Sequence, residues 1–155
     1  MSHSTIANHI LEVFTGNNWT DVNIQDTIKD ISFTEAIAIT PASPNSIASI
    51  LYHLKFYNKI MQQRLQGVVQ KVNAANGFDM PALQSENDWK NLINETRQSF
   101  IDIAKATEIF PEERLAETGP DGQTSFYKNL HGLAEHAHYH LGQIVILKNL
   151  IRSKQ

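Results

Sequence analysis

The apolar residues of this 155-residue chain recur at helical spacing in four long segments, and this periodicity is the strongest constraint on its fold. The segments span residues 4–15, 45–66, 86–109 and 124–151, and glycine or proline stands beside most of their ends. The alternation typical of a strand occurs only around residues 36–40. The pattern predicts an all-α four-helix bundle, with residues 1–155 forming a single domain.

A long connection, residues 17–44, separates the first two predicted helices. Its asparagines and prolines favour turns, and its isoleucines predict short helical pieces that dock on the core. We expect Ser43 or Asn45 to cap the second long helix. We also expect substrate to enter through the mouth formed by this connection and the helix ends.

Composition narrows the classes of function. The chain has 13 Lys and Arg against 16 Asp and Glu, and its basic residues are scattered, so we expect no nucleic-acid partner. It has no cysteine, which excludes disulfides, thiolate metal ligands and a cysteine nucleophile. No apolar run approaches the roughly 18 residues of a membrane span and no signal peptide is evident. We therefore expect a cytoplasmic protein without a membrane partner.

Four of the seven histidines fall between His131 and His140. His136 and His140 are four residues apart, which places them one turn apart on the same helix face. Two imidazoles so placed can each bring a nitrogen to about 2.0–2.1 Å from one divalent cation. His131 and His138 fall on the opposite side of the helical wheel, where solvent exposure or a subunit contact is expected.

His53 is the third candidate ligand. It lies in the inward-facing stripe of the second long helix, where an aliphatic residue would serve the core better. Together with His136 and His140 it makes a three-nitrogen set from two helices, which leaves coordination positions for water or a small-molecule substrate. The set predicts one divalent transition metal, with zinc, nickel, iron and manganese all left open. Because the ligands must be neutral, we expect affinity to fall below about pH 6.5.

Two familiar metal sites do not fit this chain. The zinc-protease motif needs a glutamate directly after the first helical histidine, and that position is Ala137. Glu135 precedes the histidine and lies off the ligand face. Di-iron bundles need several inward glutamates, which the predicted inner faces lack. Neither long helix that carries histidines offers an obvious general base, so no catalytic residue is assigned.

Other residues near the predicted ligands are candidates for supporting roles. Gln143 shares the ligand face and is a candidate to orient a ligand or a bound water. Tyr57 and Tyr139 flank the histidines and are candidate hydrogen-bond donors to a substrate. Arg64 lies on the inner face, two turns or more away, and is a candidate to meet an anionic substrate group. Gly142 is expected to allow a close helix crossing.

These residues resemble the DinB-like superfamily, which includes the YfiT-type metal-dependent hydrolases. The resemblance covers nearly the whole chain. It rests on His53 within Ser49-Ile50-Leu51-Tyr52-His53-Leu54, the string Tyr139-His140-Leu141-Gly142-Gln143-Ile144 after His136, Asn45-Ser46-Ile47, and Trp89 early in the third helix. It implies up-down-down-up connectivity, a divalent metal on the three histidines and, frequently, a homodimer.

The resemblance also implies an activity. Some members of the superfamily are transferases or isomerases that use low-molecular-weight thiols, so the leading hypothesis is a metal-dependent thiol transferase, with a hydrolase as the second enzymatic possibility. Activating a thiol needs less help than activating water, because a free thiol already ionises near pH 8.5. The alternative is a non-catalytic metal-binding or ligand-sensing dimer, since the same three ligands would serve both.

Overall fold

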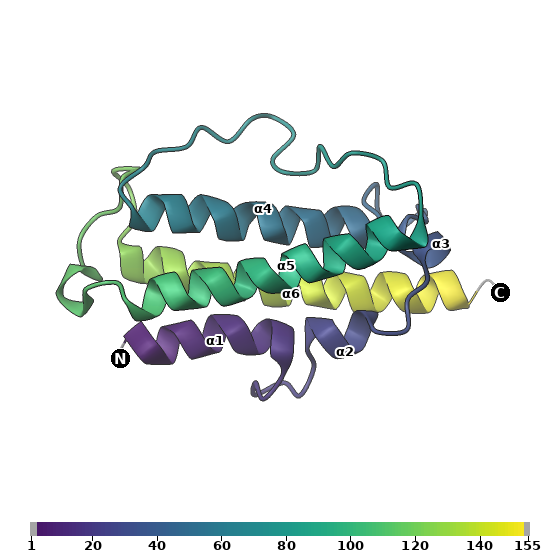
Figure 1. The fold of residues 1–155 in the computed structure, drawn as a ribbon, viewed down its shortest axis with the longest axis horizontal. Helices are drawn as coiled ribbons and strands as arrows, with labels where there is room; N and C mark the ends of the chain where they lie inside the picture. The colour runs from purple at the N-terminus through teal and green to yellow at the C-terminus, as the bar shows by residue number, and fades with distance from the viewer. Residues whose placement is uncertain (1–2, 154–155) are drawn as a thin grey trace.

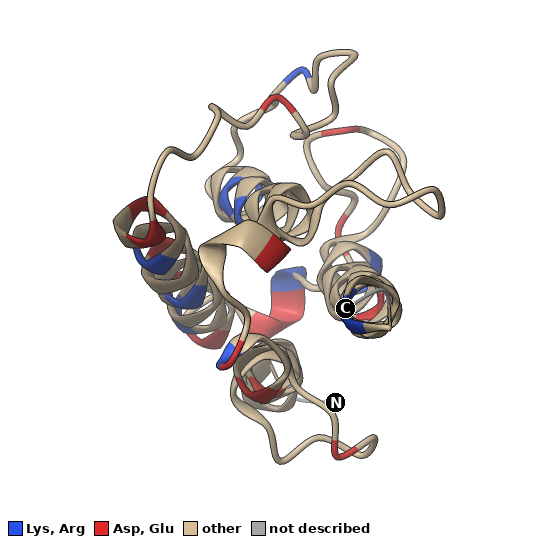
Figure 2. Ribbon diagram, turned by 90° about the vertical axis from the view of Figure 1, so that its right-hand side faces the viewer, with Lys and Arg blue, Asp and Glu red and all other residues tan. Residues whose placement is uncertain are grey.

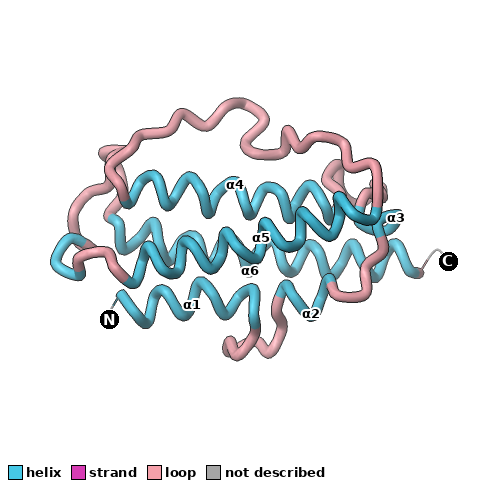
Figure 3. The backbone as a smooth tube through the Cα atoms, in the orientation of Figure 1, coloured by secondary structure: helices cyan, strands magenta, loops and turns pink. Residues whose placement is uncertain are grey.

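The computed structural model describes residues 3–153, and these form six α-helices and one 3-10 helix without a β-strand (Figures 1 and 3). The predicted all-α class is confirmed, and each predicted long helix is found within two residues of its predicted ends. In chain order the elements are α1 (His3–Thr15), α2 (Ile24–Ile28), α3 (Phe33–Ala36), α4 (Ile47–Leu65), α5 (Glu86–Glu108), η1 (Glu112–Arg114) and α6 (Phe126–Arg152).

Serine side chains cap the three longest helices. Ser46, Ser85 and Ser125 each precede a helix and accept a hydrogen bond from a backbone N–H in its first turn. These bonds satisfy N–H groups that have no partner inside the helix. The cap of α4 is therefore Ser46 and not Ser43 or Asn45, because the helix begins only at Ile47.

The four long helices enclose one apolar core. α4 packs on α5 and α6, while α1 packs on α5 and α6 from the other side. At the centre the rings of Phe14 and Phe100 lie 5.3 Å apart, and both residues are fully buried. Burial of this kind contributes roughly 25 cal/mol for each Å² of apolar surface removed from water. The core thus holds α4 and α6 in the fixed relation that the histidines require.

Contacts along α4 give the directions of its neighbours. Lys55 donates to Glu95 and Asn58 donates to Ser99, so numbering rises together along α4 and α5. Against α6 the order is reversed, because His53 lies beside His136 whereas Arg64, eleven residues later, lies beside residue 129. Residues 66–85 therefore return along the length of α4 to reach the start of α5 (Figure 1).

The connection 17–44 carries α2 and α3 and is anchored to the end of α6. Lys148 donates to Asp30, and Arg152 donates to both Asp30 and Glu35. These hydrogen bonds from Lys148 and Arg152 lower the pKa of the Asp30 carboxyl, and the Arg152 guanidinium lowers that of Glu35 to about 2. The predicted short helical pieces are present here and dock on the core through Ile24, Ile28 and Ala36.

Basic and acidic residues are interspersed over the helices and connections (Figure 2). Among the helices of the described chain, none combines the length and apolar character that a membrane crossing requires.

The fold makes the two tryptophans unequal. Trp89 is 1% exposed and its indole N–H donates to the Ile31 carbonyl at 2.8 Å, which ties α5 to the segment between α2 and α3. We expect Trp89→Phe to lower the free energy of unfolding by about 1–3 kcal/mol, because the buried carbonyl loses its donor. Trp19 is 97% exposed and supplies the control, because Trp19→Phe should change the free energy of unfolding by less than about 0.5 kcal/mol. Urea unfolding followed by circular dichroism measures both, and equal losses would contradict the role of Trp89.

Candidate metal centre

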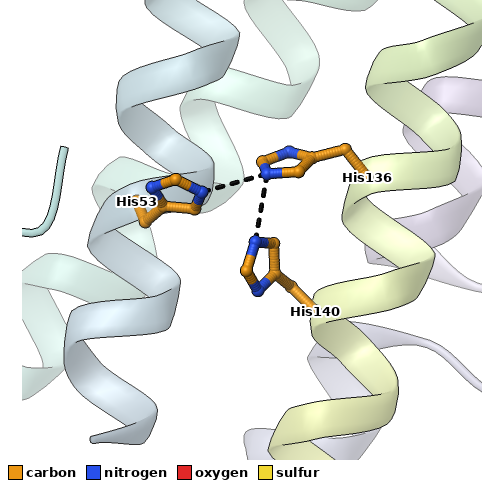
Figure 4. Close-up of side chains that lie close together, drawn as sticks. All are labelled: His53, His136 and His140. Atoms are coloured by element: carbon orange, nitrogen blue, oxygen red, sulfur yellow. Dashed lines mark hydrogen bonds between the residues drawn. The ribbon is translucent and has the colours of Figure 1, made fainter. Parts of the chain in front are cut away.

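Three histidines converge between α4 and α6. His53 comes from α4, and His136 and His140 come from successive turns of α6 (Figure 4). The Nε2 atom of His136 lies 3.0 Å from Nε2 of His53 and 3.0 Å from Nε2 of His140. One nitrogen from each residue falls within 4.8 Å of the others, so this set could hold a metal ion. The structure thus brings together all three ligands that the sequence predicts.

The spacing of the nitrogens suits a first-row cation. With metal–nitrogen distances of about 2.0–2.1 Å, two ligands at angles between a right angle and the tetrahedral angle lie about 2.8–3.4 Å apart. The two distances of 3.0 Å involving His136 fall in that range. Imidazole nitrogens suit zinc, copper, iron and nickel alike, so this donor set fits a divalent transition metal without selecting one.

The backbone fixes the tautomer of His53. Its Nδ1 lies 2.8 Å from the carbonyl oxygen of Asn76, and since a carbonyl only accepts, Nδ1 carries the proton and Nε2 keeps its lone pair. The phenol of Tyr57 donates to the side-chain oxygen of the same Asn76, and the ring of Phe78 stacks on the imidazole with centroids 4.0 Å apart. His53 therefore presents Nε2 toward His136 in a fixed orientation.

A tight turn at residues 73–78 delivers these contacts. Asn76 and Gly77 both have positive φ, at 53° and 76°, a conformation that asparagine tolerates and glycine adopts freely. A Cβ on Gly77 would lie 2.5 Å from the ring of Phe56, so the turn also needs glycine for close packing on α4. Neither Asn76 nor Phe78 stands out in the sequence as a site residue. The Asn-Gly pair signals a turn, but nothing in the sequence shows where that turn docks.

Gln143 orients His140, the third candidate ligand. Its Oε1 lies 2.7 Å from Nδ1 of His140, which places a proton on Nδ1 and leaves Nε2 free. The Gln143 amide nitrogen in turn donates to the Tyr139 hydroxyl at 3.0 Å. Tyr139 is thus linked to His140 through Gln143, and its own side chain is largely exposed. The predicted position of Gln143 on the ligand face is confirmed.

The surroundings hold the imidazoles neutral. Burial lowers the pKa of His53 to about 4, and the nearby His140 contributes a smaller lowering. The hydrogen bond to Asn76 acts in the opposite direction but does not offset burial. Burial together with the fields of His140 and His53 lowers the pKa of His136 to about 4. Burial also lowers that of His140. Protons are therefore expected to compete with a metal at folded His53 and His136 near pH 4, below the value of about 6.5 expected from an unperturbed histidine.

Two hollows that border α4 differ in their relation to the site. A hollow of about 730 Å³ lies between α4, α5 and residue 70, and contains none of the three histidines. A smaller one, of about 250 Å³, is bordered by His136, Tyr57 and Arg64. The smaller hollow thus places two predicted substrate-binding candidates beside a ligand. The connection that contacts the ligands is residues 66–85, not the connection 17–44 that we expected to form the mouth.

The other face of α6 is separate from this centre, as its helical spacing predicts. The rings of His131 and His138 lie 6.3 Å and 6.0 Å from that of His9 on α1. Glu135 borders a hollow on this same side. The expectation for Gly142 is wrong: the residue is exposed, and a Cβ there would meet no atom within 4 Å.

Comparisons of the chain with known protein families, with curated proteins and with solved structures found no match.

The turn at residues 73–78 can be tested through metal affinity. In Gly77→Ala the new Cβ meets Phe56 and the backbone must leave its positive φ, which shifts the Asn76 carbonyl away from His53. Loss of such a supporting bond typically costs 10–100-fold in metal affinity, so we expect a reduction of about tenfold or more in competition with a chelator.

Gly142→Ala is the matched control. It makes the same chemical change two residues from His140, in open space on α6. We expect its affinity to stay within about twofold of the parent, since alanine is favoured over glycine in a helix. Equal losses in the two variants would contradict the role of the turn.

The depressed pKa values predict how acid affects the metal-free protein. Unfolded histidines bind protons near pH 6.5, whereas folded His53 and His136 do so near pH 4, so the unfolded state binds more protons between these values. The free energy of unfolding should therefore fall as the pH drops from about 6.5 to about 4, by up to roughly 3 kcal/mol for each group.

A histidine variant separates this effect from general acid unfolding. His136→Gln should have a shallower dependence on pH than the parent, while His138→Gln, on the opposite face, should keep the parent slope. Urea titrations at several pH values measure the three slopes. Identical slopes in all three proteins would show that the pKa of His136 does not differ between folded and unfolded chains.

Proposed function

We propose that this chain is a divalent-metal-binding protein of the DinB-like superfamily that activates a low-molecular-weight thiol, as a thiol-dependent transferase. The observation that carries the proposal is the convergence of His53, His136 and His140. In His53 and His140 a carbonyl oxygen accepts the Nδ1 proton, so Nε2 keeps its lone pair for a metal. A divalent cation held there supplies Lewis acidity, which lowers the pKa of a bound thiol or water.

The chemistry around the histidines favours a thiol over water. In the part of the chain that the structure describes, one group of histidine or acidic side chains lies close enough together to hold a metal ion. It consists of these three imidazoles and contains no carboxylate. Glu135, the carboxylate nearest in sequence, borders the hollow on the other side of α6. Water needs a base to take its proton, whereas a thiol with a pKa of about 8.5 ionises with modest help. Hydrolysis is accordingly the less favoured alternative.

Two features of the fold support the family assignment. α4 and α5 run in the same direction and are joined by a connection along the bundle, which agrees with up-down-down-up connectivity (Figure 3). Trp89 is buried at the start of α5, where the resemblance expects it. A homodimer is part of the same proposal. Exposed Trp19 and Ile146 are apolar side chains that a second copy would remove from water.

Metal content is the first test of the proposal. Untagged protein purified without chelator should carry about one divalent first-row metal per chain, and His53→Ala should lose it because two imidazoles on one helix bind far more weakly. His138→Ala removes a histidine from the other face of α6 and should retain the metal. If the parent stays metal-free after dialysis against zinc or cobalt, the proposal is wrong.

Thiol activation is then measured on the cobalt-loaded protein. Addition of 2-mercaptoethanol at pH 7 should produce a near-ultraviolet charge-transfer band and release about one proton per site, because the free thiol is protonated at this pH. A protein that binds cobalt but responds to thiol with neither signal would be a metal-binding or ligand-sensing bundle instead.

A further inference from the structure

The hollow of about 250 Å³ beside His136 has apolar walls and a cationic end. Its sides include Tyr57, Met61 and Leu133, from α4 and α6. Its charged lining residues are Arg64 and Lys128, both basic, and the lining includes no acidic residue. The other lining residues are Thr124, Asn129, Gly132 and His136.

Arg64 is held in place at the far end of this hollow. Its Nη1 donates to the side-chain oxygen of Asn129 at 3.1 Å. The amide nitrogen of Asn129 is itself bound to the Thr124 hydroxyl at 2.9 Å and to the Ser125 carbonyl at 3.0 Å, so the orientation of the amide is fixed. A guanidinium has five N–H donors in a planar fork, and one suffices for Asn129. The fork is thus positioned before any ligand arrives.

Asp121 lies near Arg64 but is directed toward its own loop. Its Oδ2 is 3.9 Å from Nη1 of Arg64, longer than a hydrogen bond. The same carboxylate accepts hydrogen bonds from the backbone N–H groups of Gln123 and Thr124 and from the Thr124 hydroxyl. These bonds, with a smaller contribution from Arg64, lower the pKa of Asp121. Asp121 therefore does not occupy the remaining N–H donors of Arg64, which are available to a ligand in the hollow.

The rise of α6 gives the distance between the two ends of the hollow. Asn129, which holds the guanidinium, and the ligand His136 are seven residues apart, which corresponds to about 10 Å of helix rise. A molecule that reaches from the metal centre to Arg64 must be elongated, and its middle must pass Met61 and Leu133.

We propose that this hollow is a substrate subsite that binds the terminal carboxylate of an elongated, largely apolar acid on Arg64, while the reacting end of the acid lies at the three histidines. This inference rests on the proposed function, because the metal centre defines where the reacting end lies. Arg64 is the anchor because its fork matches a carboxylate in two hydrogen bonds. Lys128, at the surface, adds positive charge to the same end.

The test uses thiols that differ only in their far end. The cobalt-loaded protein is titrated with ω-mercaptoalkanoic acids of increasing chain length and with the matching mercaptoalcohols, and binding is followed by the charge-transfer band. The acid should bind best when its extended length is about 10 Å, and about tenfold more tightly than its alcohol. Arg64→Gln should abolish this preference and leave the alcohol unchanged, which also shows that the variant is folded.

Lys59→Gln is the matched control, since it removes one positive charge from an exposed position of α4 that borders the larger hollow instead. It should keep the preference for the acid. A second readout needs no metal: an alkanoic acid of the same length should shift the Nε–H resonance of Arg64 in the metal-free protein, and the corresponding alcohol should not.

The outcomes separate the two proposals. If the alcohols and acids bind equally at every length, or if Lys59→Gln and Arg64→Gln weaken the acid equally, the subsite is wrong while thiol binding stands. If no thiol binds, the proposed function fails, and the metal-free measurement still decides whether Arg64 recognises a carboxylate.

Discussion

The burial of three imidazoles between α4 and α6 is the constraint on which the rest of the structure depends. A buried imidazole needs a partner for each nitrogen, or the cost of removing it from water is not offset. His53 and His140 are 2% and 6% exposed, and each has a carbonyl oxygen on Nδ1. What is left is the Nε2 of His136, 3.0 Å from the Nε2 of His53 and 3.0 Å from that of His140, and at most one proton can be shared at each contact. A single cation would satisfy all three nitrogens at once.

The parallel course of α4 and α5 makes this arrangement possible. α4 has 19 residues and is about 28 Å long, so the chain must travel that distance before α5 can begin. An extended chain covers it in roughly nine residues. The connection 66–85 is about twice as long, and the surplus forms the turn that brings Asn76 and Phe78 onto His53. A shorter hairpin between antiparallel helices would have no segment lying over the histidine.

The sequence predicts the parts of the site that are set by helical geometry. The pairing of His136 with His140 follows from their spacing of one turn, and the inward position of His53 follows from the apolar stripe around it. The same reasoning identifies Arg64 and Gln143. It does not reach Asn76 and Phe78, because their contacts join a connection to a helix some twenty residues earlier and no periodicity predicts such a contact. The same limit explains the wrong expectation for Gly142, whose missing side chain faces open space instead of a neighbouring helix.

Charge links the metal centre to the hollow beside it. The pKa values of His53 and His136 are lowered by burial, so the ligands are neutral and would leave the double charge of a bound cation uncompensated. Carboxylate ligands, as in di-iron bundles, would cancel part of that charge. At the other end of the hollow Arg64 and Lys128 add positive charge, and Tyr57, Met61 and Leu133 form sides that are largely apolar between the two ends. With a divalent cation bound, the proposed site would favour a molecule that is anionic at both ends, as a thiolate with a remote carboxylate is, over one that carries a cation at either position. Under the proposed function, the lack of acidic residues in the lining of this hollow both makes hydrolysis the less favoured alternative and favours an anionic substrate.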